Sequence, residues 1–408
     1  MGVSTRYAVR SVVRNIRRTL LSVIGIGVGC ALALVMEGIN RGKAELLVRM
    51  TVNSGVGHVK VVPAGWTERR DVRLRLADWE RARTEAGRLP DAQVVASHAR
   101  AQVLLAMGSR VVPLEMLGVE PSVEPALNLY ARRLSHGRYL APGERGTAVI
   151  GQAVADRLRV EVEDEVMATA VGQGGAIAST MLRIVGIVST GSEDVDAGIC
   201  HVPFDEVGRL TGLPGASDVA VLIGDWRRTD AVRASLAVRL PAGDLAVTWG
   251  EAAPELRGHF DQDTATSRVV SVIILLIVLL GVASAQLAGV LERRRELAVL
   301  AAVGMRGWAM AQLVVQEALA LGALGGVAGL ALGVPLTWQL ARHGIDFGRL
   351  GGIASEGLIM EPVIYGDFGS WIVGYTFLVA IVATLVASLY PAWYAARTDP
   401  ATALRVAP

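Results

Sequence analysis

The sequence predicts a membrane α-helical protein with four transmembrane helices and a large extracytoplasmic α/β (α+β) domain inserted between the first two helices. Three observations lead to this fold class. The 408 residues are 52% hydrophobic and only 19% charged, whereas soluble domains carry about 25% charged residues. The hydrophobic residues gather in four stretches long enough to cross a bilayer, which takes about 20 apolar residues. The segment between the first two stretches has the composition of an ordinary soluble domain.

We predict transmembrane helices at 19–39, 269–291, 312–340 and 371–390. Their orientation follows from arginine placement, because short cytoplasmic flanks are enriched in basic residues. Residues 1–18 hold five arginines and no acidic residue, 292–311 hold four arginines, and the tail at 391–408 holds two. We therefore expect both termini to be cytoplasmic. The segment at 40–268 and the loop at 341–370 are expected on the opposite side.

Residues 1–18 predict an amphipathic helix on the cytoplasmic leaflet, because their arginines and their aliphatic residues occupy different faces of a helical wheel. A simple topology signal is an alternative. A cleaved signal peptide ending near Cys30 is a third possibility, but the apolar run continues through Met36. If the helix is retained, Cys30 lies in the membrane and Cys200 outside it, so the two cannot pair. We expect Cys200 to be buried.

The segment at 40–268 predicts a mixed α/β domain. Apolar residues recur at helical spacing from Val72 to Leu89, and Pro90 ends that predicted helix. Two β-rich runs flank Gly108-Ser109, which predicts a hairpin. Helix–strand units at both ends of the segment predict one subdomain closed by distant pieces, with a second inserted at about 115–222. The β-rich runs are 93–107 and 111–119; further strands are predicted at 147–150, 165–170, 181–188, 219–223 and 245–249, and a helix at 229–239.

The sequence contains no catalytic or cofactor-binding motif that we recognise. A phosphate-binding loop has the pattern G-x-x-x-x-G-K-[ST], and the chain has only two lysines, Lys43 and Lys60. The nearest approach is GINRGKA at 38–44, which has one residue too few and ends in alanine. The six histidines form no metal-ligand pair, and no G-x-S-x-G motif is present. We therefore expect a non-catalytic chain without its own cofactor or metal. The net charge of +2 does not indicate nucleic-acid binding.

Small residues in two predicted transmembrane helices indicate close helix packing. Gly25 and Gly29 lie four apart in the first helix, and Gly325, Gly329 and Gly333 continue the same spacing in the third. Internal packing is the favoured interpretation, and a subunit interface is the alternative.

The third predicted helix also carries an acidic residue, Glu317, near its cytoplasmic end. An acidic side chain in a transmembrane segment suggests a function by default. Because Glu317 lies near the interface, we expect a structural bond rather than proton transport.

Two segments resemble the signatures of the FtsX/MacB-type (type VII) ABC transporter permeases. The first is the run LERRRELAVLAAVGM at 291–305, and the second is YPAWYAARTDPATALR at 390–405. Within this superfamily, the sequence most resembles the lipoprotein-releasing (LolC/LolE-like) transmembrane subunits. The pieces that carry this resemblance are 57–60, 63–66, 118–121, 136–140, 149–151 and 247–251.

The resemblance implies that residues 292–311 form a coupling helix that docks on a separate cytoplasmic ATPase. Gly304 would end this helix, as glycine commonly does. A positive-inside anchor is the alternative for the arginines, although it would not require the acidic residues. The residues expected at the docking surface are Glu292, Arg295, Glu296, Leu297, Val299, Leu300, Val303, Gly304 and Met305.

The resemblance also implies an apolar substrate cavity between the first and second transmembrane helices of two permease subunits. Its expected lining is Val28, Leu32, Met36, Ile273, Leu276 and Val278. ATP and magnesium would be bound by two copies of the ATPase. The other implied partners are a second permease subunit (the same chain or a paralogue), a lipoprotein substrate and membrane lipids.

The implied location is the bacterial inner membrane, with the large domain in the periplasm. A periplasmic lipoprotein carrier is a further partner that the resemblance suggests, but the loop at 171–179 is short and glycine-rich where the carrier-docking relatives have a long loop. The function implied is ATP-driven release of lipoproteins toward the outer membrane. The alternatives are a MacB-like exporter of drugs or peptides and an FtsX-like mechanotransmitter that regulates an external partner.

Overall fold

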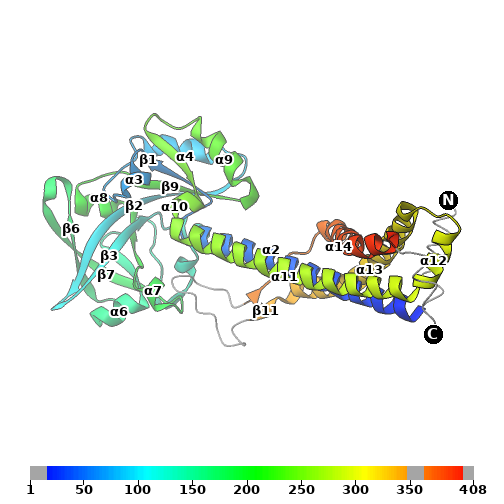
Figure 1. Ribbon diagram of the computed structural model, residues 1–408. Helices are drawn as coiled ribbons and strands as arrows, with labels where there is room; N and C mark the ends of the chain where they lie inside the picture. Colours follow the sequence, from blue (N-terminus) through cyan, green and yellow to red (C-terminus); the bar gives the residue numbers. More distant parts are fainter. Residues whose placement is uncertain (1–15, 347–362, 398–408) are drawn as a thin grey trace. The chain divides into compact units, whose positions relative to one another are not determined.

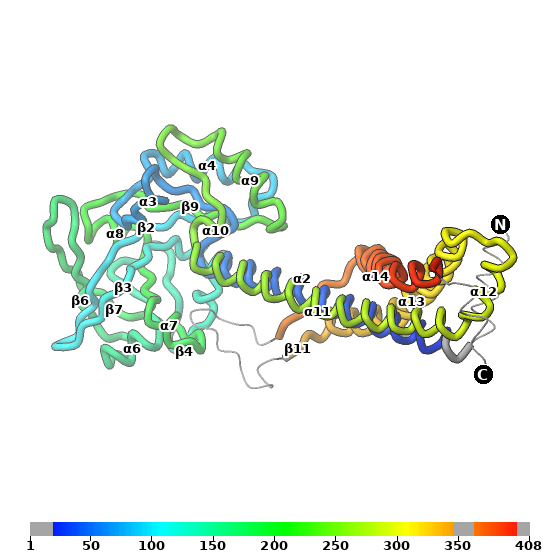
Figure 2. Tube along the Cα trace, in the orientation of Figure 1, coloured from blue at the N-terminus to red at the C-terminus, as the bar shows by residue number. Residues whose placement is uncertain are grey.

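The computed structural model describes residues 16–346 and 363–397, which form two compact units (Figures 1 and 2). Of the described residues, 16–45, 262–346 and 363–397 form the helical unit, and 46–261 form the α/β unit. The expected terminal segments at 1–15 and 398–408 and most of the loop at 341–370 lie outside the described residues.

Four long helices build the helical unit, and each is long and apolar enough to cross a membrane. They contain the four predicted stretches. The first two are longer than predicted, because α2 continues past residue 39 and α11 begins before residue 269. The helices are α2 (Ile16–Val52), α11 (Pro254–Glu292), α13 (Gly307–His343) and α14 (Trp371–Ala396), with the short α12 (Arg294–Ala302) between α11 and α13.

The long helices pack through small side chains. A methyl group added at Gly326 would lie 3.2 Å from the Cβ of Ala380, so α13 and α14 approach closely at this point. Hydroxyl groups on these helices donate to the carbonyl four residues earlier: Thr337 to Gly333 at 2.9 Å and Thr376 to Ile372 at 2.8 Å. These bonds let polar residues lie in an apolar bundle without an unpaired donor.

The α/β unit contains a ten-stranded mixed sheet in the order β10-β1-β9-β2-β3-β8-β5-β7-β4, with β6 paired to β2 and β7. Its insertion between the first two long helices agrees with the predicted architecture. The strands are β1 (Val59–Pro63), β2 (Ala92–Met107), β3 (Arg110–Val119), β4 (Leu134–Gly137), β5 (Thr147–Gly151), β6 (Glu165–Val171), β7 (Ile177–Val188), β8 (Cys200–Pro203), β9 (Asp218–Ile223) and β10 (Asp244–Thr248).

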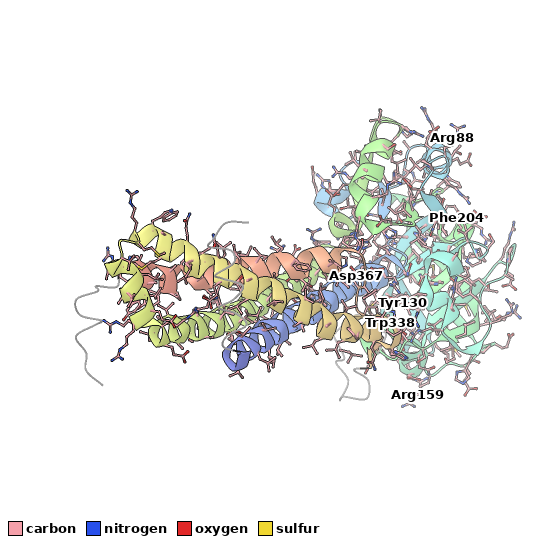
Figure 3. All side chains as sticks on the ribbon, turned by 90° about the vertical axis from the view of Figure 1, so that its right-hand side faces the viewer. Arg88, Tyr130, Arg159, Phe204, Trp338 and Asp367 are labelled. Carbon is pink, nitrogen blue, oxygen red and sulfur yellow. The ribbon has the colours of Figure 1, made fainter. Side chains whose placement is uncertain are left out.

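Short helices complete this unit. Phe204, at the start of α8, packs against both large hydrophobic clusters of the sheet and lies 5.3 Å from the ring of Trp79 (Figure 3). Cys200 is buried and unpaired. The helices are α3 (Trp66–Arg69), α4 (Trp79–Gly87), α5 (Glu124–Leu127), α6 (Gln152–Leu158), α7 (Glu193–Asp196), α8 (Phe204–Thr211), α9 (Thr229–Ala237) and α10 (Trp249–Ala252). A two-stranded sheet of β11 (Ile345–Asp346) and β12 (Val363–Ile364) belongs to the helical unit.

The long strand β2 belongs to two sub-sheets. Its first half pairs with β9 up to His98, and its second half pairs with β3 from Ala99 onward. Because β9 also pairs with β1, it belongs with the chain ends and not with the inserted part. The boundaries expected at about 115 and 222 therefore fall in the wrong places: the first cuts β3 and the second includes β9.

The helix predicted from Val72 to Leu89 is shorter than expected. It begins at Trp79, because the Asp78 side chain accepts a hydrogen bond from the Arg81 amide and caps the helix. Leu76 lies in the segment before this helix and is buried there. Its apolar side chain therefore fitted the helical spacing without being part of the helix. The predicted hairpin is confirmed, with Gly108 at φ 60° between β2 and β3.

Candidate functional site

The segment between α11 and α13 is a short helix with a turn at each end. The long helix α11 ends at Glu292, and Arg293 (φ −98°, ψ 16°) interrupts the helical path before α12 begins. At the other end, the amides of Gly304 and Met305 donate to the carbonyls of Ala301 and Leu300, both at 3.0 Å. This Schellman arrangement needs a left-handed residue, and Gly304 supplies it with φ 99°.

One face of α12 packs inside the helical unit. Leu297 and Ala298 are buried in a cluster with Val290, Val314 and Ala395, which come from the neighbouring long helices. Met305 packs against the same cluster. Leu297 was expected at a docking surface, and the structure corrects this, because its buried side chain holds α12 to its own chain. Met305 is half-buried, and its predicted place at the docking surface stays a prediction.

Exposed apolar side chains occur on and just after α12. Val299 on α12, Val303 at its end and Trp308 at the start of α13 are 51%, 83% and 74% exposed, and we call these three residues the α12 patch. Exposure of large apolar side chains within one short segment is typical of an interaction site. Of the other residues expected here, Glu292, Arg295 and Gly304 are exposed, while Glu296 and Leu300 are half-buried. Trp308 was missed, because it follows the motif and begins the next helix.

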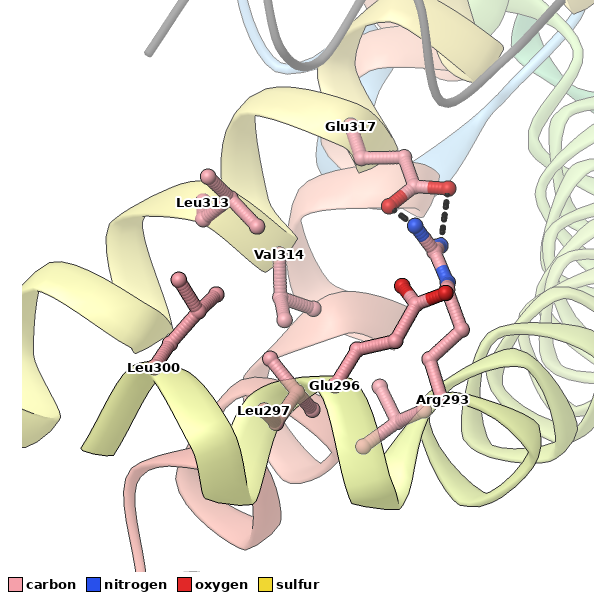
Figure 4. A pocket seen from close by; sticks show the side chains of 8 residues that line it. Arg293, Glu296, Leu297, Leu300, Leu313, Val314 and Glu317 are labelled. Atoms are coloured by element: carbon pink, nitrogen blue, oxygen red, sulfur yellow. Dashed lines mark hydrogen bonds and ion pairs between the residues drawn. The ribbon is translucent and has the colours of Figure 1, made fainter. Parts of the chain in front are cut away.

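A small pocket of about 20 Å³ separates α12 from α13 (Figure 4). Arg293 reaches from the turn to Glu317 on α13, and its Nη2 lies 2.5 and 2.6 Å from the two carboxylate oxygens. Glu317 thus makes a bond within its own chain, as the sequence predicted. The pocket is lined by Val290, Arg293, Glu296, Leu297, Leu300, Leu313, Val314 and Glu317.

The residues expected to line a substrate cavity lie in three different places. Val28, Leu32, Ile273 and Leu276 are each about half exposed, between 48% and 53%, on α2 and α11. Met36 lies in a separate small hollow with Tyr375. Val278 differs from the expectation, because its side chain packs onto α2, where a methyl group at Gly29 would lie only 2.5 Å from it.

The glycine motif of α13 packs against α2, whereas Gly29 of the α2 motif faces Val278 on α11. Added methyl groups at Gly325, Gly329 and Gly333 would collide with Ile26, Cys30 and Leu34 respectively. Gly27, which the motif search missed, would meet Ala328 at 2.9 Å. At Gly25 an added methyl would meet nothing within 4 Å, so Gly25 makes no packing contact in the described chain.

A buried cluster of charged residues lies where β2 passes between the two sub-sheets. Asp218 on β9 accepts from the Nδ1 of His98 at 3.0 Å and from the Nε of Arg100 at 2.7 Å, and it lies 3.3 Å from the Nζ of Lys60. The Nε2 of His98 lies 2.9 Å from Glu124. Sequence analysis missed this cluster because its members come from different elements. Within the described residues, no group of three or more His, Cys, Asp or Glu is arranged to hold a metal ion.

The cluster keeps His98 protonated. Burial lowers the pKa of His98, but the attraction of Glu124 and the hydrogen bonds to Asp218 and Glu124 outweigh it and raise the pKa to about 9. Two other buried histidines behave oppositely, because burial lowers the pKa of His58 and of His201 to about 4.

These shifts predict a stability maximum of the α/β unit near pH 6.5, the ordinary pKa of histidine. The contribution of His98 is complete below pH 6.5 and is lost as the pH rises toward 9. The contributions of His58 and His201 are complete above pH 6.5 and are lost as the pH falls toward 4. The test is the urea concentration at which half of this unit is unfolded, measured at each pH by proteolysis of the full chain in detergent. A midpoint that rises steadily from pH 6.5 to 9 would contradict it.

Two family models match this chain. The model of the MacB-like periplasmic core domain matches residues 19–239, which is more than half of the chain, and the model of the FtsX-like permease C-terminal region matches residues 268–400, which include α12. The chain belongs to the FtsX/MacB-type ABC transporter permeases. In this permease, the α/β unit corresponds to most of the first match and the α12 patch lies in the second.

Individual relatives of the permease carry the names of two transport systems. The lipoprotein-releasing system transmembrane protein LolC of Xylella fastidiosa is 25% identical over 403 residues, with 95% of the permease and 93% of LolC covered. The macrolide export ATP-binding/permease protein MacB of Hyphomonas neptunium is 26% identical over 420 residues, with 98% of the permease and 60% of MacB covered. Among solved structures, the periplasmic region of MacB from Actinobacillus actinomycetemcomitans is 13% identical, with 50% of the permease and 94% of that chain covered and a TM-score of 0.35.

Proposed function

We propose that the permease works with a separate ATPase to extract lipoproteins from the inner membrane for delivery to the outer membrane. The observation that supports this most is the match to LolC, which spans nearly the whole of both chains. The match to MacB is similar in identity but spans about 60% of a relative named for both ATP binding and permeation.

The α12 patch is the surface we assign to ATPase docking. A helix with one face fixed to its own bundle and the other face apolar and exposed is suited to fill a groove on a partner. With α12 docked in the cytoplasm, the α/β unit lies in the periplasm and both termini are cytoplasmic. ATP and magnesium belong to the ATPase, of which we propose two copies.

The exposed apolar residues of α2 and α11 are the surface we assign to the lipid part of the substrate. Moving an acyl chain into water costs about 0.8 kcal/mol per CH₂, so three long chains approach roughly 40 kcal/mol. An apolar cavity avoids this cost. We propose that Val28, Leu32, Ile273 and Leu276 of this permease form one wall of that cavity and a second permease subunit forms the other.

Depletion of the permease tests the proposal. Mature lipoproteins are expected to accumulate in the inner-membrane fraction, and re-expression of the wild-type chain is expected to restore their delivery. Lipoprotein delivery that stays normal while sensitivity to macrolides rises would instead support export of the kind named for the MacB relatives. Normal delivery without any change in drug sensitivity would favour a mechanotransmitter.

A further inference from the structure

An ion pair between Arg293 and Glu317 links the start of α12 to the body of α13. Both side chains are largely shielded from water, at 17% and 10% exposed. The pair joins the turn that ends α11 to the third turn of α13, so it crosses the gap in which the small pocket lies (Figure 4).

We propose that Arg293 and Glu317 are positioning residues that make α12 and α13 move as one body when the ATPase displaces α12. This inference rests on the proposed ATPase partner. It concerns how motion passes from the α12 patch into the long helices, and it does not depend on which substrate is carried.

The geometry of α12 explains why such a link is needed. The helix has a turn at both ends, at Arg293 and at Gly304, so it does not continue directly into either long helix. Leu297 and Ala298 pack it against the neighbouring helices. Apolar contacts are non-directional, whereas the charge-assisted contact of Nη2 with both carboxylate oxygens requires Arg293 to stay within hydrogen-bond distance of Glu317.

Stability alone does not account for the pair. Replacing a buried ion pair with apolar side chains of similar volume is often neutral or stabilising, because charges are costly to remove from water. The surroundings of the pair already supply such side chains, including Leu297, Leu300 and Val314. The ion pair therefore adds a directional constraint to the contact between α12 and α13.

The test uses the full complex of permease and ATPase in lipid nanodiscs. Trp338 is 43% exposed toward the other end of α13, and the native Cys30 and Cys200 are buried, so Trp338→Cys places an accessible thiol that reports movement of α13. In the otherwise wild-type complex, maleimide labelling at 338 is expected to change when ATP and vanadate are added. With Glu317→Gln, the ATPase is expected to remain bound and to hydrolyse ATP, but the labelling change is expected to fall by about tenfold, within the usual range of coupling between sites.

Two further variants make the result decisive. The exchange Arg293→Glu with Glu317→Arg restores an ion pair of opposite direction and is expected to recover most of the labelling change, which a variant that merely failed to fold would not do. Glu37→Gln is the matched control, because it breaks an exposed ion pair with Arg41 at 2.8 Å on α2 and is expected to change nothing.

A full labelling change with Glu317→Gln would overturn the inference, and so would an exchange variant as defective as Glu317→Gln. These outcomes are independent of lipoprotein release. A wild-type complex that shows the ATP-dependent change at 338 but releases no lipoprotein would refute the proposed function and leave the inference standing.

Discussion

A permease carrying Val303→Glu and Trp308→Glu is expected to lose its ATPase. Both side chains are exposed, at 83% and 74%, and a tryptophan at the centre of an interface often contributes more than 2 kcal/mol to binding. Two carboxylates in an apolar groove add the cost of burying unpaired charge. We expect the amount of ATPase that co-purifies with the detergent-solubilised permease to fall by more than about tenfold.

The control for this experiment is Val238→Glu. Val238 is 88% exposed in the α/β unit, so the substitution adds the same charge as Val303→Glu alone, at a similarly exposed valine far from α12 in the sequence. It is expected to leave co-purification unchanged. Full recovery of the ATPase with the double variant would exclude the α12 patch as the docking surface.

Asp218→Asn is expected to give the largest loss of stability in the α/β unit. The carboxylate faces three cationic side chains, those of Lys60, His98 and Arg100, and it is 2% exposed. Removing one partner from a buried ionic cluster typically costs about 3–5 kcal/mol, because charges are left uncompensated in a medium of low polarity. We expect the urea midpoint for proteolysis of this unit to fall accordingly.

Asp71→Asn provides the comparison. Asp71 also contacts an arginine, Arg73, at 2.7 Å, but that pair lies at the surface, and exposed pairs contribute about 0–1 kcal/mol. Its midpoint is expected to stay close to that of the wild-type chain. An equal fall in the urea midpoint for both substitutions would mean that the buried Asp218 cluster stabilises the unit no more than a surface ion pair does.

The sequence predicted the features that depend on local pattern. The four apolar stretches lie within the four long helices because hydropathy alone decides whether a segment can enter a bilayer. The β2–β3 hairpin and the end of α12 at Gly304 followed from turn residues that need positive φ.

Features that depend on packing were not predictable in the same way. Leu297 and Val299 are both aliphatic and only two residues apart, yet one is buried and the other is exposed, because α13 and α14 cover a single face of α12. The partners of Glu317 and Asp218 are distant along the chain, and a single sequence carries no signal that brings them together.

The dual pairing of β2 limits how this permease can be recombined with its relatives. A chimera that exchanges residues 115–222 would break β3 and would separate β9 from β1. The segment from the relative would then have to form backbone hydrogen bonds with strands of this permease on both sides. Exchange points after Glu45 and at Gln262 keep every strand of the ten-stranded sheet in one parental sequence and join the two parents within the continuous helices α2 and α11. Such a whole-unit exchange tests which unit determines the substrate.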